Sequence, residues 1–404
     1  MSVCGMIVEW NPFHNGHAYL IQELRGRQPN TVIIAIMSGN YVQRGQAALL
    51  SKWQRTEVAL KNGCDLVVEL PFWYAVQPAD LFAKGAVGCL HALGCQQLAF
   101  GSELEDFAPY QELAQWVSDH EEIVALKQQN EAFHANNYGK SSISLLADLV
   151  AEVPELRHLK IDFTDNSNVL LAYSYAKANA KYQTPMSLTA IKRQGSQHRD
   201  DDMRPGANYA SSTSIRKALL EDQIDCRQLD RLMPKAMVEK LELVNYDSSW
   251  SALYPLLRYK ILSESRQKLA DYYQVYEGIE KNLIEAARKE TCYADFLNQV
   301  TNKKWSKYRI QRALLMIFLG VSDQEMQDHL KKRQPLYLLG TNARGRNYLK
   351  GLEITDPSSY AMINRVGKEE SKAWPLWIRV DEIYQRIVMK SKGSQLFAHP
   401  PIML

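Results

Sequence analysis

The sequence has no apolar segment long enough to cross a lipid bilayer and nothing that resembles a secretion signal. The apolar stretch "ALLMIFLGV" in its C-terminal half falls far short of the roughly 20 residues that a spanning helix needs. Glu9 interrupts the first apolar run, and no basic segment precedes that run. We therefore expect a soluble protein that does not associate with membranes.

The sequence is also poor in cysteine, and its cysteines are scattered. None of them forms a CxxC pair, which disfavours a zinc site and a disulfide framework. This usage is typical of a reducing compartment, so we expect a cytoplasmic protein. The six residues are Cys4, Cys64, Cys89, Cys95, Cys226 and Cys292.

Two common phosphate-binding loops are missing as well. The sequence contains neither the GxGxxG of dinucleotide-binding folds nor the GxxxxGKS or GxxxxGKT of P-loop NTPases. A nucleotide site in this protein, if present, has to be built in another way.

Charge is present but unevenly distributed over the 404 residues. Residues 1–230 carry 20 Lys and Arg against 26 Asp and Glu, a net charge of −6. Residues 231–404 carry 28 against 19, a net charge of +9. Such asymmetry indicates that the C-terminal part meets a polyanion, although a solvated basic surface remains an alternative.

The N-terminal part alternates short, continuous apolar runs with helical patterns. Continuous runs are typical of strands that are buried on both faces, and strand–helix alternation predicts a parallel sheet with helices on both sides. The predicted strands are 2–8, 31–37, 65–71, 96–102 and 187–193, and the predicted helices lie near 16–26, 51–62 and 78–94.

From about residue 235 the pattern is mainly helical. The stretch "QPLYLLGTNARGRNYL" and the residues after it predict a small α/β end module. The predicted fold class is therefore α/β, a doubly wound parallel sheet followed by a mainly helical C-terminal domain. We place the two domains at 1–230 and at 231–404.

The turn after the first strand reads "EWNPFHNGH". Gly16 allows a phosphate or a base to approach the backbone, and the start of the following helix offers free N–H groups to an anion. His14 and His17 add side-chain donors for charge on a phosphate oxygen. The turn thus predicts a nucleotide-phosphate site without a P-loop.

Two other interpretations of the histidine pair remain open. One histidine could cap the helix while the other packs in the core. The pair could also bind a metal ion, but that requires a third ligand, for which Glu9 and Asp65 are candidates.

The turn is similar to the HxGH signature of the nucleotidylyltransferase superfamily, whose members have a doubly wound fold and split ATP between the α- and β-phosphates. The order of "VEWNPFHNGH", "MSGNYVQRGQ", "SKWQRTEVAL", "DLVVELPFWYAVQPADLFAKGAV" and "FGSE" resembles one family closely, tRNA(Met) cytidine acetate ligase. The resemblance implies that ATP activates acetate as acetyl-adenylate. The acetyl group then passes to the wobble cytidine of elongator methionine tRNA, giving N4-acetylcytidine.

The resemblance also implies site residues. His14 and His17 would be catalytic, and a phosphate-binding role is possible for Ser212, Thr213, Ser214 and Arg216 of "SSTSIRK". Asn168 matches an ATP-binding Asn, with Asn166 as the alternative, and Arg193 matches a phosphate-facing Arg, with Lys192 less clearly so. The ATP-binding set is Ile7, Val8, Glu9, Trp10, Asn11, Pro12, Phe13, His14, Asn15, Gly16, His17, Ala18, Tyr19, Leu20, Gly101, Asn168 and Arg193. No metal ligand is assigned, although Mg²⁺ is expected to accompany ATP.

The basic segment "KKWSKYRIQR" predicts the tRNA contact. Cations neutralise phosphates, and aromatic rings stack on unpaired bases. Trp305 and Tyr308 lie between the cations, although an ordinary solvated helix face is nearly as good an interpretation. The predicted tRNA-binding residues are Lys303, Lys304, Lys307 and Arg309, with Arg312 nearby.

Two other functions keep part of this pattern. A nucleotidylyltransferase acting on a small phosphate ester would use the histidine pair but leave the basic half without a role. A non-catalytic RNA-binding protein would leave the histidine pair without one. We expect tRNA as the partner, and the sequence implies no protein partner. The resemblance implies that the domain 1–230 binds ATP and holds the catalytic residues and that the basic domain 231–404 binds tRNA.

Overall fold

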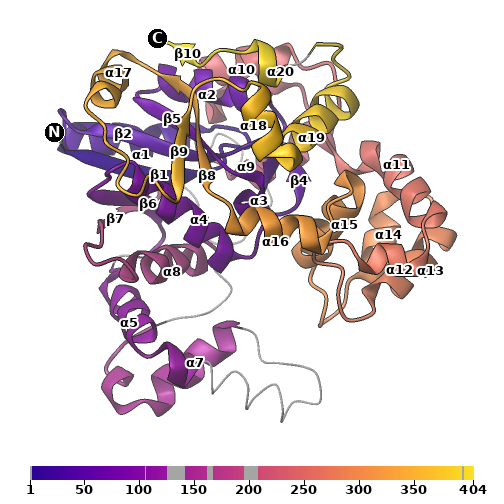
Figure 1. The fold of residues 1–404 in the computed structure, drawn as a ribbon, viewed down its shortest axis with the longest axis horizontal. Coiled ribbons are helices and arrows are strands. Elements are labelled where there is room, and N and C mark those ends of the chain that lie inside the picture. The colour runs from indigo at the N-terminus through magenta and orange to yellow at the C-terminus, as the bar shows by residue number, and fades with distance from the viewer. Residues whose placement is uncertain (1, 105, 125–141, 162–166, 195–207, 394) are drawn as a thin grey trace.

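The computed structural model describes residues 2–104, 106–124, 142–161, 167–194, 208–393 and 395–404. A central sheet runs in the order β10-β8-β5-β2-β1-β6-β7, with β9 also paired to β8 (Figure 1). Its strands are β1 (Val3–Val8), β2 (Val32–Ser38), β5 (Leu66–Leu70), β6 (Gln97–Ser102), β7 (Ser187–Lys192), β8 (Gln334–Thr341), β9 (Tyr360–Ile363) and β10 (Ile402–Met403). A short hairpin pairs β3 (Tyr41–Val42) with β4 (Gln46–Ala47).

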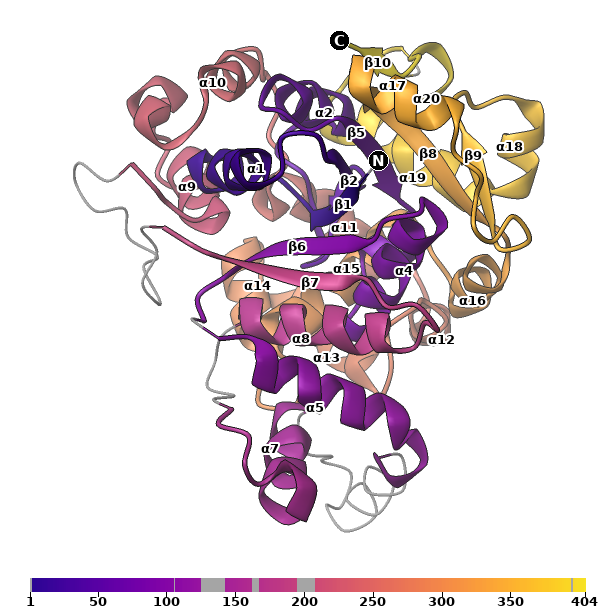
Figure 2. The same cartoon turned by 90° about the vertical axis from the view of Figure 1, so that its left-hand side faces the viewer.

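The five N-terminal strands are parallel to their neighbours, as the continuous apolar runs predict. Every residue of β2 and β5 is buried. Helices α1 and α2 lie on one side of the sheet, and α4 and α8 lie on the other (Figure 2). The helices of this part are α1 (Asn15–Arg27), α2 (Lys52–Lys61), α3 (Phe72–Ala75), α4 (Ala79–Ala92), α5 (Ala108–Asp119), α7 (Ser142–Glu152), α8 (Ser167–Ala180) and α9 (Ser212–Leu220), with short 3-10 turns at Pro154–Leu156 and Cys226–Leu232.

The order of the strands reverses at β1. The chain passes from β1 to β2 on one side, and it later returns to place β6 on the other side of β1. In doubly wound sheets, ligands bind where the strand order reverses, at the C-terminal ends of the strands. The turn 9–14 follows β1 at this position, so the predicted fold class, a doubly wound α/β sheet, is confirmed together with the place it assigns to the turn.

The C-terminal part begins with helices, which gather beside the sheet (Figure 1). The helical pattern between residues 266 and 289 is interrupted by a turn in which Gln274, Glu277 and Gly278 have positive φ. The helices here are α10 (Lys235–Glu242), α11 (Trp250–Ser263), α12 (Arg266–Ala270), α13 (Ile279–Lys289), α14 (Tyr293–Val300), α15 (Lys307–Leu319) and α16 (Asp323–Lys331).

The predicted separate end module after residue 334 is wrong, because β8 joins the central sheet. Strand β8 pairs antiparallel with β5, so the sheet is mixed. Strands β9 and β10 each pair with a different half of β8 along the edge that faces away from β5. A boundary at residue 230 therefore does not separate two independent sheets. The remaining helices are α17 (Ala343–Lys350), α18 (Lys368–Ala373), α19 (Pro375–Ile383) and α20 (Gln395–Ala398), and α19 continues into a π-helical turn at Tyr384–Val388.

A buried cluster of charges ties α19 to the N-terminal strands. The Lys52 ammonium lies 2.7 Å from a Glu69 carboxylate oxygen and also pairs with Asp381. Asn40 donates a hydrogen bond to the other Asp381 oxygen. No described helix is both long and apolar enough to cross a membrane.

Candidate active site

The two histidines of the turn organise the start of α1. His14 is the N-cap, and its Nδ1 accepts a hydrogen bond from the Gly16 N–H. The His17 Nδ1 accepts one from the His14 N–H, and the two rings stack with centroids 3.7 Å apart. Since Nδ1 is the acceptor in both rings, the proton of each neutral imidazole lies on Nε2 and is available to a ligand.

Both histidines are held uncharged. Burial, followed by the charge of Arg193, lowers the pKa of His14 to about 3. Burial, His14 and Arg193 lower the pKa of His17 well below its ordinary value. At neutral pH the pair therefore acts as two N–H donors beside a helix N-terminus, a combination that stabilises charge on phosphate oxygens. The capping alternative and the donor role are compatible, because each ring caps through one nitrogen.

The other residues of the 7–20 segment have different surroundings. The side chains of Trp10 and Phe13 are buried in the core, so they can face a ligand only through their main chain. Asn15 donates to the carbonyls of Asn208 and Arg231 and so fastens the chain after β7 onto α1.

A second group of predicted residues gathers at the ends of β6 and β7. Arg193 Nη1 lies 3.4 Å from Glu103 Oε1, and Asn168 Nδ2 donates to the same oxygen at 2.6 Å. A Cβ on Gly101 would lie 3.2 Å from the Arg193 side chain, so glycine leaves room for it. Glu103 was not predicted, although the motif "FGSE" contains it. Asn166 lies outside the described residues.

The motif "SSTSIRK" forms the start of α9, as predicted, with Ser211 as its capping residue. Ser212 Oγ donates to the Pro12 carbonyl, and Arg216 donates to the Asn11 carbonyl. Burial lowers the pKa of Arg216 to about 10, which leaves it charged at neutral pH. The structure therefore brings this motif against the β1–α1 turn.

Arg44 was not singled out from the sequence, although "MSGNYVQRGQ" contains it. It follows β3, and its guanidinium donates to Thr213 Oγ1 and to the Tyr308 hydroxyl. Arg216 reaches the same Thr213 oxygen. The sequence feature that could have identified Arg44 is its position as a cation shortly after the C-terminal end of β2. This fold binds ligands at that edge of the sheet.

The basic segment divides into two kinds of residue. Lys304 and Arg309 each lie 3.3 Å from a Glu277 carboxylate oxygen, whereas Lys303 and Lys307 are exposed. The expectation that Trp305 stacks on a base is wrong, because its ring is 3% exposed and covered by the Arg309 guanidinium at 3.9 Å.

The predicted Arg312 also differs from a phosphate-facing cation. It is partly buried and donates through Nε to Gln274 Oε1. Burial lowers its pKa to about 10, which leaves it charged at neutral pH.

Asp65 cannot complete a metal site with the histidines. It precedes β5 and binds Arg25 at 2.6 Å, at the edge of the sheet opposite the turn. Within the described ranges, no three His, Cys, Asp or Glu side chains gather in a way that could hold a metal ion.

If Arg193 faces the ATP phosphates, as the resemblance implies, Arg193→Ala should weaken ATP binding about 10-fold or more, because a charge-assisted hydrogen bond to phosphate would be lost. Asn168→Ala should act on nucleotide positioning and raise the KM for ATP. Arg27→Ala is the matched control, because it removes an exposed arginine in the last turn of α1, at the end of that helix opposite the turn. Calorimetric titration with ATP measures the difference, and wild-type affinity in both of the first two variants would remove them from the site.

Known proteins resemble this chain over its whole length. The HIGH Nucleotidyl Transferase family matches residues 1–397. The tRNA(Met) cytidine acetate ligase of Latilactobacillus sakei is 38% identical over 100% of this chain and 97% of its own length, and that of Bacillus subtilis is 31% identical with the same coverage.

Solved structures also resemble this chain over its whole length. Thermotoga maritima TmcAL in its apo form has a TM-score of 0.86 at 25% identity, and the same protein bound with alpha-thio ATP has a TM-score of 0.84 at 25% identity. Each alignment covers 100% of both chains. The chain therefore belongs to the HIGH nucleotidyl transferase family and, within it, to the tRNA(Met) cytidine acetate ligases.

Proposed function

We propose that this chain activates acetate with ATP and transfers the acetyl group to the wobble cytidine of elongator methionine tRNA. The observation that carries the proposal is the stacked, neutral histidine pair at the start of α1, in a chain that relatives of this name match from end to end. A cytoplasmic location for this enzyme is part of the same proposal.

In the first step a carboxylate oxygen of acetate attacks the α-phosphorus of ATP, and pyrophosphate leaves. Negative charge then grows on oxygens of the transferring and leaving phosphates. The Nε2–H groups of His14 and His17 and the Arg193 guanidinium can stabilise this charge, because all three are donors held in place before the reaction. Mg²⁺ is expected to arrive with the ATP phosphates.

In the second step the exocyclic amine of cytidine attacks the acetyl carbonyl carbon, AMP leaves, and the amine loses one proton. The base has to leave its stack to reach the anhydride. The adenylate supplies a good leaving group, which compensates for the weak nucleophilicity of the cytidine amine. We assign no covalent protein intermediate.

The proposal is tested by mixing the protein with ATP and labelled acetate, with and without bulk tRNA. We expect acetate-dependent exchange of pyrophosphate into ATP without RNA, and label in tRNA when RNA is added. Exchange that depends on a small phosphate ester instead of acetate would favour the nucleotidylyltransferase alternative. Absence of any exchange, with tRNA binding intact, would favour a non-catalytic RNA-binding protein.

Replacing Lys303 and Lys307 together with alanine should weaken tRNA binding. These exposed cations are proposed phosphate contacts, so the slope of log affinity against log salt should flatten by about one unit per lost contact. Filter binding over a salt series measures this slope, with Lys235→Ala and Lys372→Ala as a control of equal charge on exposed helix surfaces.

Acetyl-adenylate formation without tRNA should stay unchanged in the Lys303 and Lys307 variant. Impaired adenylate formation with normal tRNA affinity would place these residues in the catalytic site instead. We expect a smaller effect from Lys304 and Arg309, because both already pair with Glu277.

A further inference from the structure

Three segments that are distant in the sequence meet at the Arg44 side chain. Arg44 Nη1 donates to Thr213 Oγ1 at 3.2 Å and to the Tyr308 hydroxyl at 3.1 Å. The guanidinium carbon lies 4.6 Å from the centroid of the Tyr308 ring. We name Arg44, Thr213 and Tyr308 the junction, because it joins the start of α9 and the start of α15 to the β3–β4 hairpin.

The hairpin loop that carries Arg44 is fixed on two sides. Gly45 has φ of +74°, and a Cβ there would lie 2.5 Å from the Arg312 backbone nitrogen, so glycine allows the loop to press against α15. Trp250 Nε1 donates to the Gly45 carbonyl at 3.0 Å. On the other side, the Gln43 N–H donates to Glu9 Oε1 at 2.7 Å. The position of Arg44 relative to both α15 and the β1–α1 turn is therefore set by the fold.

The junction lies beside a second cation, Arg216. Arg44 and Arg216 both donate to the same Thr213 oxygen, and neither forms a salt bridge with a described Asp or Glu side chain, although the charge of Glu9 raises the pKa of Arg216 against the effect of burial. Arg309 is different, since it pairs with Glu277 and covers a buried tryptophan. Two guanidinium groups that share one hydroxyl favour an anion between or beside them.

Tyr308 adds an exposed ring to these cations. The side chain is 37% exposed and lies in the first turn of α15, next to the exposed Lys307. An exposed aromatic ring with a guanidinium beside it is a suitable surface for an unpaired base, because bases stack on both groups.

A continuous chain of contacts leads from this ring to the proposed catalytic turn. Tyr308 contacts Arg44, Arg44 and Arg216 both bind Thr213, and Arg216 donates to the Asn11 carbonyl, three residues before His14. An RNA strand held at Tyr308 is thus placed at the rim of the site where the adenylate would form.

We infer that the junction is the RNA entry contact of the enzyme: a base next to the target cytidine stacks on Tyr308, and the adjoining phosphate binds Arg44. This inference rests on the proposed function. A target base has to be splayed out of its strand to react, so its neighbours need a surface outside the pocket that holds them. The junction has the flat ring, the charge and the position that this task requires.

The test compares Tyr308→Ala, Tyr308→Phe and Arg44→Gln in two assays with the full-length protein. One assay is acetate-dependent ATP–pyrophosphate exchange without RNA, and the other is kcat/KM for acetylation of methionine tRNA. Tyr308→Ala should lower kcat/KM for tRNA about 10-fold, the size of one lost base stack, with exchange unchanged. Arg44→Gln should lower kcat/KM for tRNA as well. Tyr308→Phe should stay near wild type, because the ring remains.

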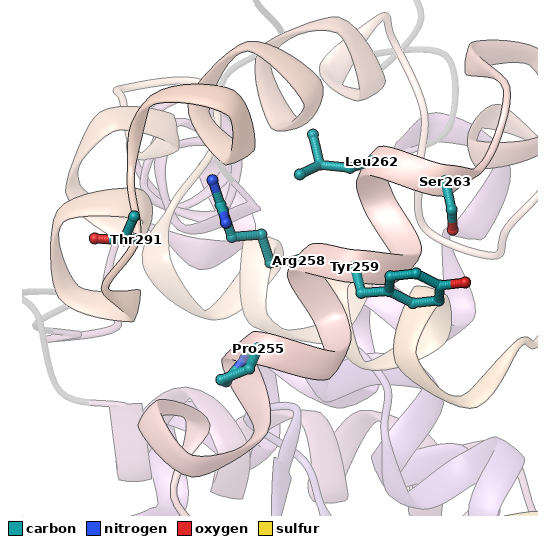
Figure 3. Close-up of a pocket in the computed structure, with 6 residues that line it drawn as sticks. All are labelled: Pro255, Arg258, Tyr259, Leu262, Ser263 and Thr291. Atoms are coloured by element: carbon teal, nitrogen blue, oxygen red, sulfur yellow. The ribbon is translucent and has the colours of Figure 1, made fainter.

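Tyr259→Ala is the matched control. Tyr259 is the more exposed ring, at 72%, and it lies with Pro255, Arg258 and Leu262 around an open pocket on the outer face of α11 (Figure 3). The described hydrogen-bond and ring partners of Arg44 are Thr213 and Tyr308, and neither lines this pocket. We expect Tyr259→Ala to keep wild-type kinetics with tRNA.

Three results would overturn the inference. They are unchanged tRNA kinetics in Tyr308→Ala, an equal loss in Tyr259→Ala, and a loss of RNA-free exchange in Tyr308→Ala, which would place the ring in the adenylate site. Failure of the proposed function would give a different result from failure of this inference, because the wild-type protein itself would then show no acetate-dependent exchange.

Discussion

His14→Ala and His17→Ala should each lower the rate of acetyl-adenylate formation about 100-fold or more, because each removes one preorganised N–H donor from the phosphate site. The rings are stacked and neutral, and each is fixed by a backbone hydrogen bond through Nδ1. Acetate-dependent ATP–pyrophosphate exchange measures the rate. Binding of tRNA should survive in both variants, since the proposed RNA contacts lie on other elements.

A cap-preserving variant separates the two roles of His14. Asparagine is a good N-cap, so His14→Asn should restore helix stability but not the Nε2 donor. If His14→Asn recovers full exchange activity, the histidine is structural and its catalytic assignment is wrong.

The ionisation of the pair gives a second check. Since burial and the charge of Arg193 hold the pKa of His14 at about 3, its ring in the free enzyme should show no titration between about pH 5 and 8, the range in which an exposed histidine gains its proton. The His17 ring should gain its proton at a lower pH than an exposed histidine does, because burial lowers its pKa. Histidine NMR shifts over that range measure it.

Lys52→Met should destabilise the fold by about 3–5 kcal/mol, because it leaves two carboxylates buried without a counter-charge. Burial alone disfavours the Lys52 ammonium, yet Asp381 and Glu69 outweigh burial and hold its pKa above the usual lysine value. Burial raises the pKa of Glu69 to about 7 even with the ammonium present. Urea unfolding monitored by tryptophan fluorescence gives the change in free energy.

Two further variants test the electrostatic cause. Lys61→Met removes an exposed i,i+4 ion pair and should change the unfolding free energy by about 1 kcal/mol or less. The triple variant Lys52→Met, Glu69→Gln and Asp381→Asn should recover part of the loss, because the uncompensated charges are gone. If the triple variant is no more stable than Lys52→Met alone, packing rather than charge explains the effect.

The sequence by itself determined the N-terminal architecture and the place of the turn. Strands buried on both faces have to be apolar throughout, and the helices between them begin at local capping residues such as Ser51 and Ser211. These signals lie within a few residues of the structure that they specify. The same holds for His14 and His17, because both the cap and the donor role depend on one turn of helix.

Tertiary structure alone decided which distant segments meet. The apolar strand at 334–341 has the same pattern whether it starts a new sheet or joins β5, and pairing settles the choice. Trp305 and Tyr308 are both aromatic residues among cations, but packing buries the first and exposes the second. Arg44 likewise gained its contacts with Thr213 and Tyr308 from the docking of the hairpin on α15, because side chains some 170 to 260 residues apart are brought together by packing and not by local sequence.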